Sequence, residues 1–230
     1  MPALPTLRAL VRDRRSRVAV LVLVTGLAAV LAWRYWDMPR SLAVEVRDRI
    51  GLQLVESHAG RIEAAARESE VDPTLIAGVM FAESRGRGGQ RSSAGAYGLM
   101  QLVPAAAGDA AMRLGVPEPT VDELRDDDDL NVRLGAAHLA WLLEHRGDWT
   151  LEQVLVSYNA GRAKLFRWIE REGSYAAWRR RELAREAAGG SPADGGPTGA
   201  LRYALQVLEA RRRLVERGVV RPIDGIETVK

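Results

Sequence analysis

Apolar residues recur at helical spacing along most of the chain, and no segment carries a convincing alternation of apolar and polar residues. A half-buried strand needs that two-residue alternation, so the sequence offers no clear source of strands. The segments that we expect to be helical are Ser41 to about Arg67, Pro73 through "LIAGVMFAES", 98–114, 129–145, 151–171, 175–188 and 199–217. Ser41 and Asp72 are expected as N-caps, and Pro73 suits a first helical position. The pattern predicts an all-α fold.

The first 40 residues form a basic leader to a nearly neutral body. They hold seven arginines against two aspartates, so the formal net charge of +3 for the whole chain becomes slightly negative beyond Arg40. Basicity confined to a leader is weak evidence for nucleic-acid binding, and no zinc-finger spacing or basic stripe interleaved with aromatics supports it. The absence of cysteine excludes disulfides, thiolate metal sites and cysteine nucleophiles.

An uncharged, mostly apolar run follows the arginines of "RDRRSR" and extends from Val18 to Trp33. A helix over 18–36 would be roughly 28 Å long, close to the thickness of the hydrocarbon core of a membrane. Arginines before the run predict a cytoplasmic segment 1–17, an uncleaved transmembrane anchor 18–36 and an exported body. The alternatives are a signal peptide cleaved near Ala32 and a buried core helix.

Glu83 is a lone acid at the end of an apolar run. On the helix from Pro73 it lies four residues after Val79 and three after Met80, so its carboxyl falls on the apolar face. An acid on that face loses solvation, which raises its pKa and keeps it protonated nearer neutral pH. A general acid needs that property. The alternative is a glutamate that only fringes the helix end.

A loop rich in glycine and serine follows this acid. Its sequence, "GQRSSAGAYGLMQ", lets backbone approach a ligand closely and offers hydrogen bonds to an extended polar substrate. The block from Glu83-Ser84 through Ser92 and "GAYGLMQ" to Pro104 resembles the lytic transglycosylases with a lysozyme-like fold. Three later segments, in order, are similar to further motifs of that family: "NVRLGAAHLAWLLEHRGDW" (131–149), "SYNAG" (157–161) and "YALQVL" (203–208). The resemblance covers about 58–212.

The resemblance implies an activity and its residues. In this family one glutamate serves as both acid and base on the β-1,4 bond between N-acetylmuramic acid and N-acetylglucosamine, and it leaves a 1,6-anhydromuramoyl end. Glu83 occupies that position, and a second carboxylate is not needed because the substrate supplies the other reacting groups. The motifs imply substrate contacts by Ser92, Gly98, Met100, Gln101, Tyr158 and Asn159, with Met100 packing beside the groove and Tyr158 near the acid. No metal or cofactor is expected.

Four parts are expected along the chain. They are the basic leader 1–17, the anchor 18–36, a lysozyme-like transglycosylase domain 41–217 with a motif core at 58–212 and an unusual insertion at 171–198, and a tail 218–230. This organisation implies a single-pass protein of the bacterial inner membrane, with the catalytic domain on the periplasmic side. The implied partners are peptidoglycan glycan strands, the membrane and an envelope-spanning assembly.

Several positions depart from the family pattern. Gly86 stands where an aromatic residue is usual, and Gly88 and Gln90 replace a proline and an alanine, so a more mobile loop is expected. Gly199 and Ala200 replace a Glu-Thr pair, which puts in doubt a polar contact behind the groove.

Two other functions stay open from the sequence. A lysozyme-type hydrolase on the same scaffold would want a second carboxylate, and the nearby acidic cluster is "DDDD" (126–129). We interpret that cluster as a solvated turn in which Asp128 or Asp129 caps the next helix. A non-catalytic wall-binding module is the other alternative, although a binder would not need Glu83.

The histidines and tryptophans give weaker signals. His58, His138 and His145 show no metal-ligand spacing with acids, so surface or packing roles are expected. The tryptophans at 141, 149, 168 and 178 sit at helical spacing and are expected mostly in the core, with one available to stack on a sugar.

Overall fold

The computed structural model describes residues 18, 20–27, 29–30, 40–189 and 196–220. The chain divides into two compact units, Met1–Arg47 and Asp48–Lys230. Between 18 and 30 the described residues are helical and exposed. The expected anchor 18–36 falls partly outside the described residues, at 19, 28 and 31–36. Within the described ranges, no helix combines the length and apolar character that a membrane crossing requires.

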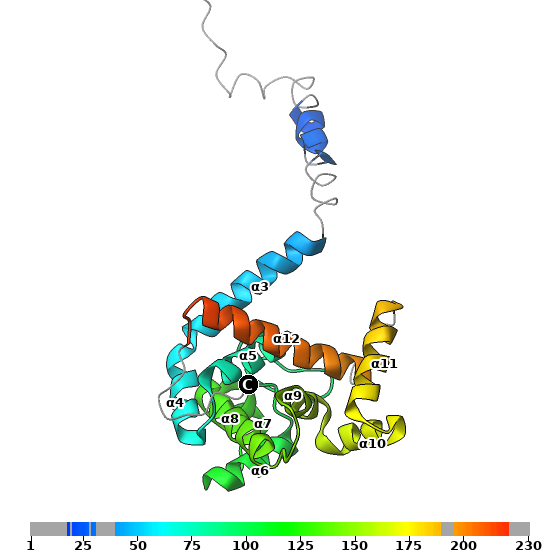
Figure 1. Cartoon of the computed structure of the whole chain (residues 1–230). Coiled ribbons are helices and arrows are strands. Elements are labelled where there is room, and N and C mark those ends of the chain that lie inside the picture. The colour runs from blue at the N-terminus through cyan, green and yellow to red at the C-terminus, as the bar shows by residue number, and fades with distance from the viewer. Residues whose placement is uncertain (1–17, 19, 28, 31–39, 190–195, 221–230) are drawn as a thin grey trace, which may run out of the picture. The chain divides into compact units, whose positions relative to one another are not determined.

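The rest of the described chain is built from helices (Figure 1). They are α3 (Arg40–Ser57), α4 (Ala59–Ser69), α5 (Pro73–Ser84), α6 (Pro104–Leu114), α7 (Val121–Asp126), α8 (Asp128–Glu144), α9 (Leu151–Ala160), α10 (Arg162–Glu172), α11 (Tyr175–Ala187) and α12 (Pro197–Glu216). The only extended pairing among the described residues is two isolated bridges, Arg91 to Tyr97 and Tyr97 to Leu102. The all-α prediction is confirmed.

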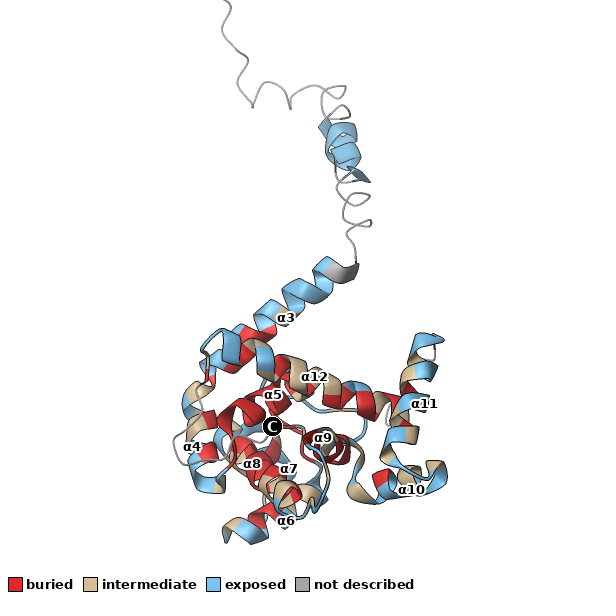
Figure 2. Ribbon diagram, viewed as in Figure 1, coloured by how far each residue is buried: buried red, intermediate tan, exposed pale blue. Residues whose placement is uncertain are grey.

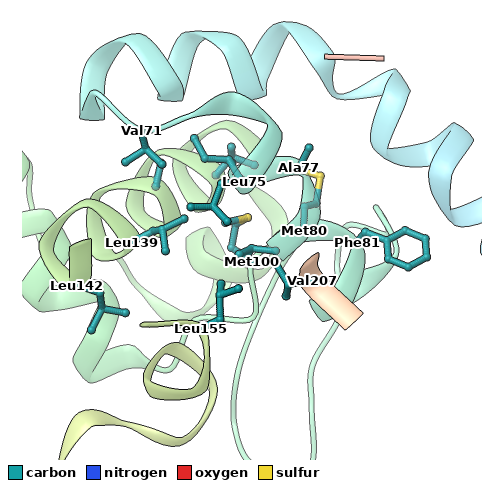
Figure 3. Packing of buried hydrophobic residues seen from close by; sticks show 14 of the residues in the cluster. Val71, Leu75, Ala77, Met80, Phe81, Met100, Leu139, Leu142, Leu155 and Val207 are labelled. Atoms are coloured by element: carbon teal, nitrogen blue, oxygen red, sulfur yellow. The ribbon is translucent and has the colours of Figure 1, made fainter. Parts of the chain in front are cut away.

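Helix α5 runs through the core of the second unit. Its residues from Pro73 to Phe81 are all buried (Figure 2), as expected for a helix whose sequence is apolar on every face. Helix α12 packs on α5 and α9. Gly78 allows the close approach, because a Cβ there would lie 2.9 Å from the carbonyl oxygen of Val207. Figure 3 shows side chains of α5, α8, α9 and α12 meeting around Met100.

The start of α5 is as the sequence predicts. Asp72 is the N-cap, and its Oδ1 accepts a 2.8 Å hydrogen bond from the backbone N–H of Thr74, with Pro73 in the first turn. The same carboxylate pairs with Arg211 of α12 at 2.6 Å. The cap therefore also joins α5 to α12.

Three expected helices have different bounds. The single helix expected over Ser41 to Arg67 is two, because the backbone turns at buried His58, whose Nε2 lies 3.0 Å from the carbonyl oxygen of Gly86. Helix α3 already includes Arg40, so Ser41 lies inside its first turn and is not the N-cap. The helix expected over 151–171 breaks at Gly161, whose φ of 85° is outside the helical range.

The segment 98–114 is helical only from Pro104. Residues 98–103 form turns, with Gly98 and Gln101 at positive φ, and Tyr97 and Leu102 exchange backbone hydrogen bonds. The expectations for 129–145, 175–188 and 199–217 agree with α8, α11 and α12 to within two residues at each end. Of the expected tail, residues 218–220 are described, and Val220 is buried.

The acidic cluster does form a helix start, but one residue earlier than expected. Asp127, not Asp128 or Asp129, is the N-cap of α8, and its Oδ1 accepts from the backbone N–H of Leu130 at 2.9 Å. Asp128 and Asp129 lie in the first turn, where the helix dipole favours negative charge. Helix α7, which the sequence analysis missed, begins at a capping box formed by Thr120 and Glu123.

Candidate active site

A cleft of about 670 Å³ opens beside the C-terminal end of α5. Its wall combines residues from α5, the loop between α5 and α6, α6, α8, α9 and the start of α10. The lining residues are Glu83, Ser92, Ser93, Ala94, Ala96, Gln101, Leu102, Val103, Ala106, His138, Trp141, Leu142, Ser157, Tyr158, Asn159, Ala160, Gly161, Arg162 and Lys164. Among these described residues, Glu83 is the only carboxylic acid.

Glu83 has the electrostatics of a protonated acid. Burial of its carboxyl raises the pKa of Glu83 from the ordinary 4.5 to about 8, and the hydroxyl of Tyr203 partly opposes that rise. Although its side chain reaches the cleft, the rest of α5 and its neighbours remove most water from around it. At neutral pH the carboxyl is therefore mostly protonated and able to donate a proton.

Two tyrosine hydroxyls lie near this carboxyl. Burial, followed by the charge of Glu83, raises the pKa of both Tyr158 and Tyr203 well above 10, so both stay neutral. Their rings lie nearly parallel, 6.4 Å apart. The hydroxyl of Tyr158 donates a 3.1 Å hydrogen bond to the carbonyl oxygen of Met100. The buried hydroxyl of Tyr203 faces Glu83 but makes no hydrogen bond of normal geometry with any described group.

The loop after α5 is held by its own backbone and by one buried asparagine. Ser92 pairs with Ala96, since each backbone N–H bonds to the other residue's oxygen. Asn131 of α8 is completely buried, and its Oδ1 accepts from the backbone N–H of Met100 at 2.8 Å. Its Nδ2 donates to the carbonyl oxygens of Tyr97 and Leu124 at 2.9 and 2.8 Å. These bonds fix the loop that carries Gln101.

The structure brings five of the seven expected site residues to the cleft: Glu83, Ser92, Gln101, Tyr158 and Asn159. Gly98 and Met100 are not among its lining residues. Gly98 has a φ of 76°, and a Cβ there would collide with the amide of Asn131. Met100 is fully buried in the core (Figure 3), and a Cβ at Gly135 would collide with its side chain. Both support the loop from behind, and neither presents a side chain to a ligand.

Sequence reasoning missed several lining residues. His138, expected in a surface or packing role, lines the cleft, and its Nδ1 is buried without a hydrogen-bond partner among the described residues. Burial, helped by the nearby Arg113, lowers the pKa of His138 to about 4, so it is neutral. Three or four residues separate successive members of the set Asn131, Gly135, His138 and Leu142, so the set shares one face of α8, toward the loop. This spacing could have been recognised in the sequence.

Arg162 and Lys164 also line the cleft and were not expected there. Trp141 is the tryptophan that reaches the cleft, whereas Trp178 is buried in the core. The acidic cluster 126–129 lines a different hollow, together with Arg61, and contributes nothing to the cleft. Within the described part of the chain, no group of His, Asp and Glu is arranged to hold a metal ion.

Glycines expected to loosen the loop are packed closely against other elements. A Cβ at Gly86 would lie 2.7 Å from the backbone nitrogen of Val55, and one at Gly88 would lie 2.5 Å from a carboxylate oxygen of Asp128. Near the start of α12, the buried Thr198 donates a 2.6 Å hydrogen bond to the buried Glu182 of α11. Both residues lie in the insertion 171–198, which therefore supplies a buried polar contact between α11 and α12. This contact is next to Gly199 and Ala200, which replace the usual Glu-Thr pair.

Known proteins match part of this chain. A segment of 82 residues is 42% identical to an endo-type membrane-bound lytic murein transglycosylase A of Klebsiella pneumoniae, covering 35% of this chain and 40% of that protein. A segment of 100 residues is 38% identical to a transglycosylase of Enterobacteria phage PRD1, covering 44% of this chain and 33% of the phage protein. The matches thus span less than half the length of these relatives.

Solved structures show the fold. An inactive mutant of the lytic transglycosylase Slt from Pseudomonas aeruginosa superposes with a TM-score of 0.56 at 22% identity, over 72% of this chain and 25% of that one. The 70 kDa soluble lytic transglycosylase of Escherichia coli gives a TM-score of 0.53 at 18% identity, over 68% of this chain and 24% of that one. These likenesses confirm the lysozyme-like helical fold.

A family profile covers the site itself. The profile described as Transglycosylase SLT domain matches residues 60–180, which is more than half of the chain and includes Glu83, the loop after it and the segment 157–161. The resemblance read from the motifs is thus borne out, and the chain belongs to the family of the transglycosylase SLT domain.

Proposed function

We propose that this chain is a peptidoglycan lytic transglycosylase in which Glu83 is the single acid and base. The observation that carries the proposal is one carboxyl in a substrate-sized cleft, with its pKa raised to about 8 and no second carboxylate among the described lining residues. Glycosidases that use water normally need two carboxyl groups. A cleft with a single carboxyl group suits a reaction in which the substrate supplies the other reacting groups.

The first step uses the proton of Glu83. The carboxyl donates it to the glycosidic oxygen as the bond from that oxygen to C1 of the muramoyl residue breaks. The N-acetyl group of the same residue stabilises the positive charge that develops at C1. Tyr203, a neutral donor, faces the carboxylate that this step creates.

The second step returns the proton. The Glu83 carboxylate takes the proton of the muramoyl 6-hydroxyl while O6 forms a bond to C1, so a 1,6-anhydro ring closes and no water is consumed. Ser92, Gln101 and Asn159 line the cleft and supply the polar groups that we assign to sugar hydroxyls and N-acetyl groups. The hydrogen bond from the Tyr158 hydroxyl to the carbonyl oxygen of Met100 fixes this wall of the cleft.

The test is mass spectrometry of muropeptides released from purified peptidoglycan by the 230-residue chain and by its Glu83→Gln variant. We expect anhydromuramoyl ends from the wild type and none from the variant, with both proteins equally folded by circular dichroism. Reducing ends, one water heavier, would instead identify a lysozyme-type hydrolase. Sedimentation with the wall and no product from either protein would identify a binding module.

We also propose that the enzyme acts in the bacterial envelope, anchored by the apolar run near its N-terminus. The arginine-flanked run at 18–36 supports this, as do relatives whose names describe them as membrane-bound. The anchor would keep the catalytic domain at the periplasmic face of the inner membrane, within reach of the wall and of an envelope-spanning assembly. Membrane fractionation tests it: release of the intact chain by salt alone would contradict an anchor.

A further inference from the structure

The cleft holds an imbalance of charge. Its charged lining residues, among those described, are Glu83, Arg162 and Lys164. Since the pKa of Glu83 is about 8, that acid is mostly neutral at pH 7, and the other two are basic side chains. The free cleft therefore carries positive charge near the start of α10.

Arg162 is held in place without a carboxylate partner. Its Nη1 donates a 2.7 Å hydrogen bond to the carbonyl oxygen of His145. Its guanidinium carbon lies 4.8 Å from the ring centre of Trp149, 5.5 Å from that of Trp141 and 5.8 Å from that of Phe166. Aromatic faces stabilise a cation without neutralising it. Across the described residues, no acid forms an ion pair with Arg162.

Lys164 lies two residues further along α10 and lines the same cleft. It is exposed, lines the cleft, and has no ion pair with any residue that the structure describes. Several other arginines among the described residues do form ion pairs, as in the Arg133–Glu68 and Arg212–Glu209 bridges. A guanidinium held by aromatic rings and an ammonium without an ion pair, both lining one cleft, are suited to bind a carboxylate.

We propose that Arg162 and Lys164 bind a carboxylate of the muramoyl residue's side group, so that the cleft selects acidic wall glycan over uncharged glycan. The inference rests on the proposed function for its substrate. Alternating N-acetylglucosamine and N-acetylmuramic acid carries negative charge only at the lactyl group or at the peptide joined to it. In denuded glycan the lactyl carboxylate is free, and in peptide-bearing glycan it is an amide while the peptide supplies the carboxylates.

Binding to three glycans tests the inference. The whole chain carries Glu83→Gln, so that no ligand is consumed, and calorimetry compares chitohexaose, a denuded wall hexasaccharide and the same hexasaccharide with tetrapeptides. Lys164→Gln should weaken binding of an acidic glycan about two- to fivefold, since an exposed ion pair contributes little. Lys164→Glu should weaken it about tenfold, and added salt should reduce the difference. Chitohexaose should bind equally well to the Glu83→Gln chain and to the same chain with Lys164→Gln or Lys164→Glu.

Arg167→Gln is the matched control. Arg167 lies on the same helix, is exposed, does not line the cleft and has no ion pair among the described residues. Its substitution should leave all three affinities unchanged. Arg162→Gln, measured beside its unfolding temperature, should give a loss for acidic glycan at least as large as Lys164→Gln, because Arg162 is the more rigidly held of the two.

The outcomes separate the two sources of the carboxylate. An effect of Lys164 confined to the denuded hexasaccharide identifies the lactyl group, and one confined to the peptide-bearing hexasaccharide identifies the peptide. An equal effect on chitohexaose, or no effect on either acidic glycan, overturns the inference. The proposed function is judged separately, by anhydromuramoyl products from the chain with Glu83 intact, so either proposal can fail while the other stands.

Discussion

The hydroxyl of Tyr203 faces the carboxyl of Glu83 and lowers the pKa of that carboxyl against the opposing effect of burial. No described group forms a hydrogen bond of normal geometry with this hydroxyl. The ring of Tyr158 is nearly parallel to that of Tyr203, but its hydroxyl donates a hydrogen bond to the carbonyl oxygen of Met100. The two tyrosines therefore lie side by side with different tasks.

Tyr203→Phe should raise the pKa of Glu83, because the group that favours its ionised form is removed. If Glu83 must be protonated to act, activity falls as pH rises through its pKa. The alkaline limb of kcat/KM for anhydromuramoyl release should then move to higher pH in this variant. Rates measured from pH 6 to 10 on purified peptidoglycan give the limb directly.

Tyr158→Phe is the matched control for that shift. Its loss of the bond to Met100 should lower the free energy of unfolding by about 1 kcal/mol. Its alkaline limb should stay in place, because the hydroxyl of Tyr158 donates to the carbonyl oxygen of Met100 and not to Glu83. An equal shift in both variants would mean that Tyr203 acts only through packing.

Ionisation of Glu83 should also make stability depend on pH. The folded pKa of about 8 lies above the 4.5 of the unfolded chain, so between these values the folded state binds more protons. The free energy of unfolding should therefore fall as pH rises from 4.5 to 8, with a slope of up to about 1.4 kcal/mol per pH unit from this group.

The Glu83→Gln variant isolates this contribution. Glutamine cannot ionise, so urea denaturation from pH 5 to 8 should give a flatter pH dependence for the variant than for the wild type. The variant should also be relatively more stable at pH 8 than at pH 5. Parallel pH curves for the two proteins would show that the carboxyl is well solvated in the fold.

Sequence reasoning succeeded where the signal was local. Asp72 and Pro73 mark the start of α5 within two adjacent residues, and the cap they form involves only their immediate neighbours. The cleft residues from Glu83 to Gln101 lie in one continuous motif, so recognising the motif placed them together. Most helix bounds were predicted for the same reason.

It failed where tertiary contacts decide. Nothing next to His58 in the chain indicates a turn, since its partner is the carbonyl oxygen of Gly86, 28 residues away. Arg162 and Lys164 reach the cleft only because the chain turns at Gly161 and starts α10 there. Met100 falls inside the motif, yet its side chain points into the core because Asn131 holds its backbone in place.

Asn131→Ala should destabilise the protein strongly. It removes the partner of the Met100 N–H and one bond to the carbonyl oxygens of Tyr97 and Leu124 in a fully buried site, although Tyr97 keeps its bond from Leu102, and it opens a small cavity. We expect a loss of about 3 kcal/mol or more in the free energy of unfolding by urea titration. Asn159→Ala is the control, since Asn159 is exposed and should cost less than about 0.5 kcal/mol. Similar losses for the two would show that the buried bonds are replaced by water.

Gly98→Ala and Gly95→Ala separate backbone strain from collision. The two glycines have nearly the same φ, 76° and 77°, so an alanine at either should cost about 1 kcal/mol in the free energy of unfolding for the left-handed backbone. A Cβ at Gly95 meets nothing within 4 Å, whereas one at Gly98 collides with the amide of Asn131. Gly98→Ala should therefore lose at least about 2 kcal/mol more, as the displaced amide gives up its buried hydrogen bonds. Thermal and urea unfolding of both variants measure the difference. If it vanished, Asn131 would have room to move, and the loop that carries Gln101 would not depend on its position.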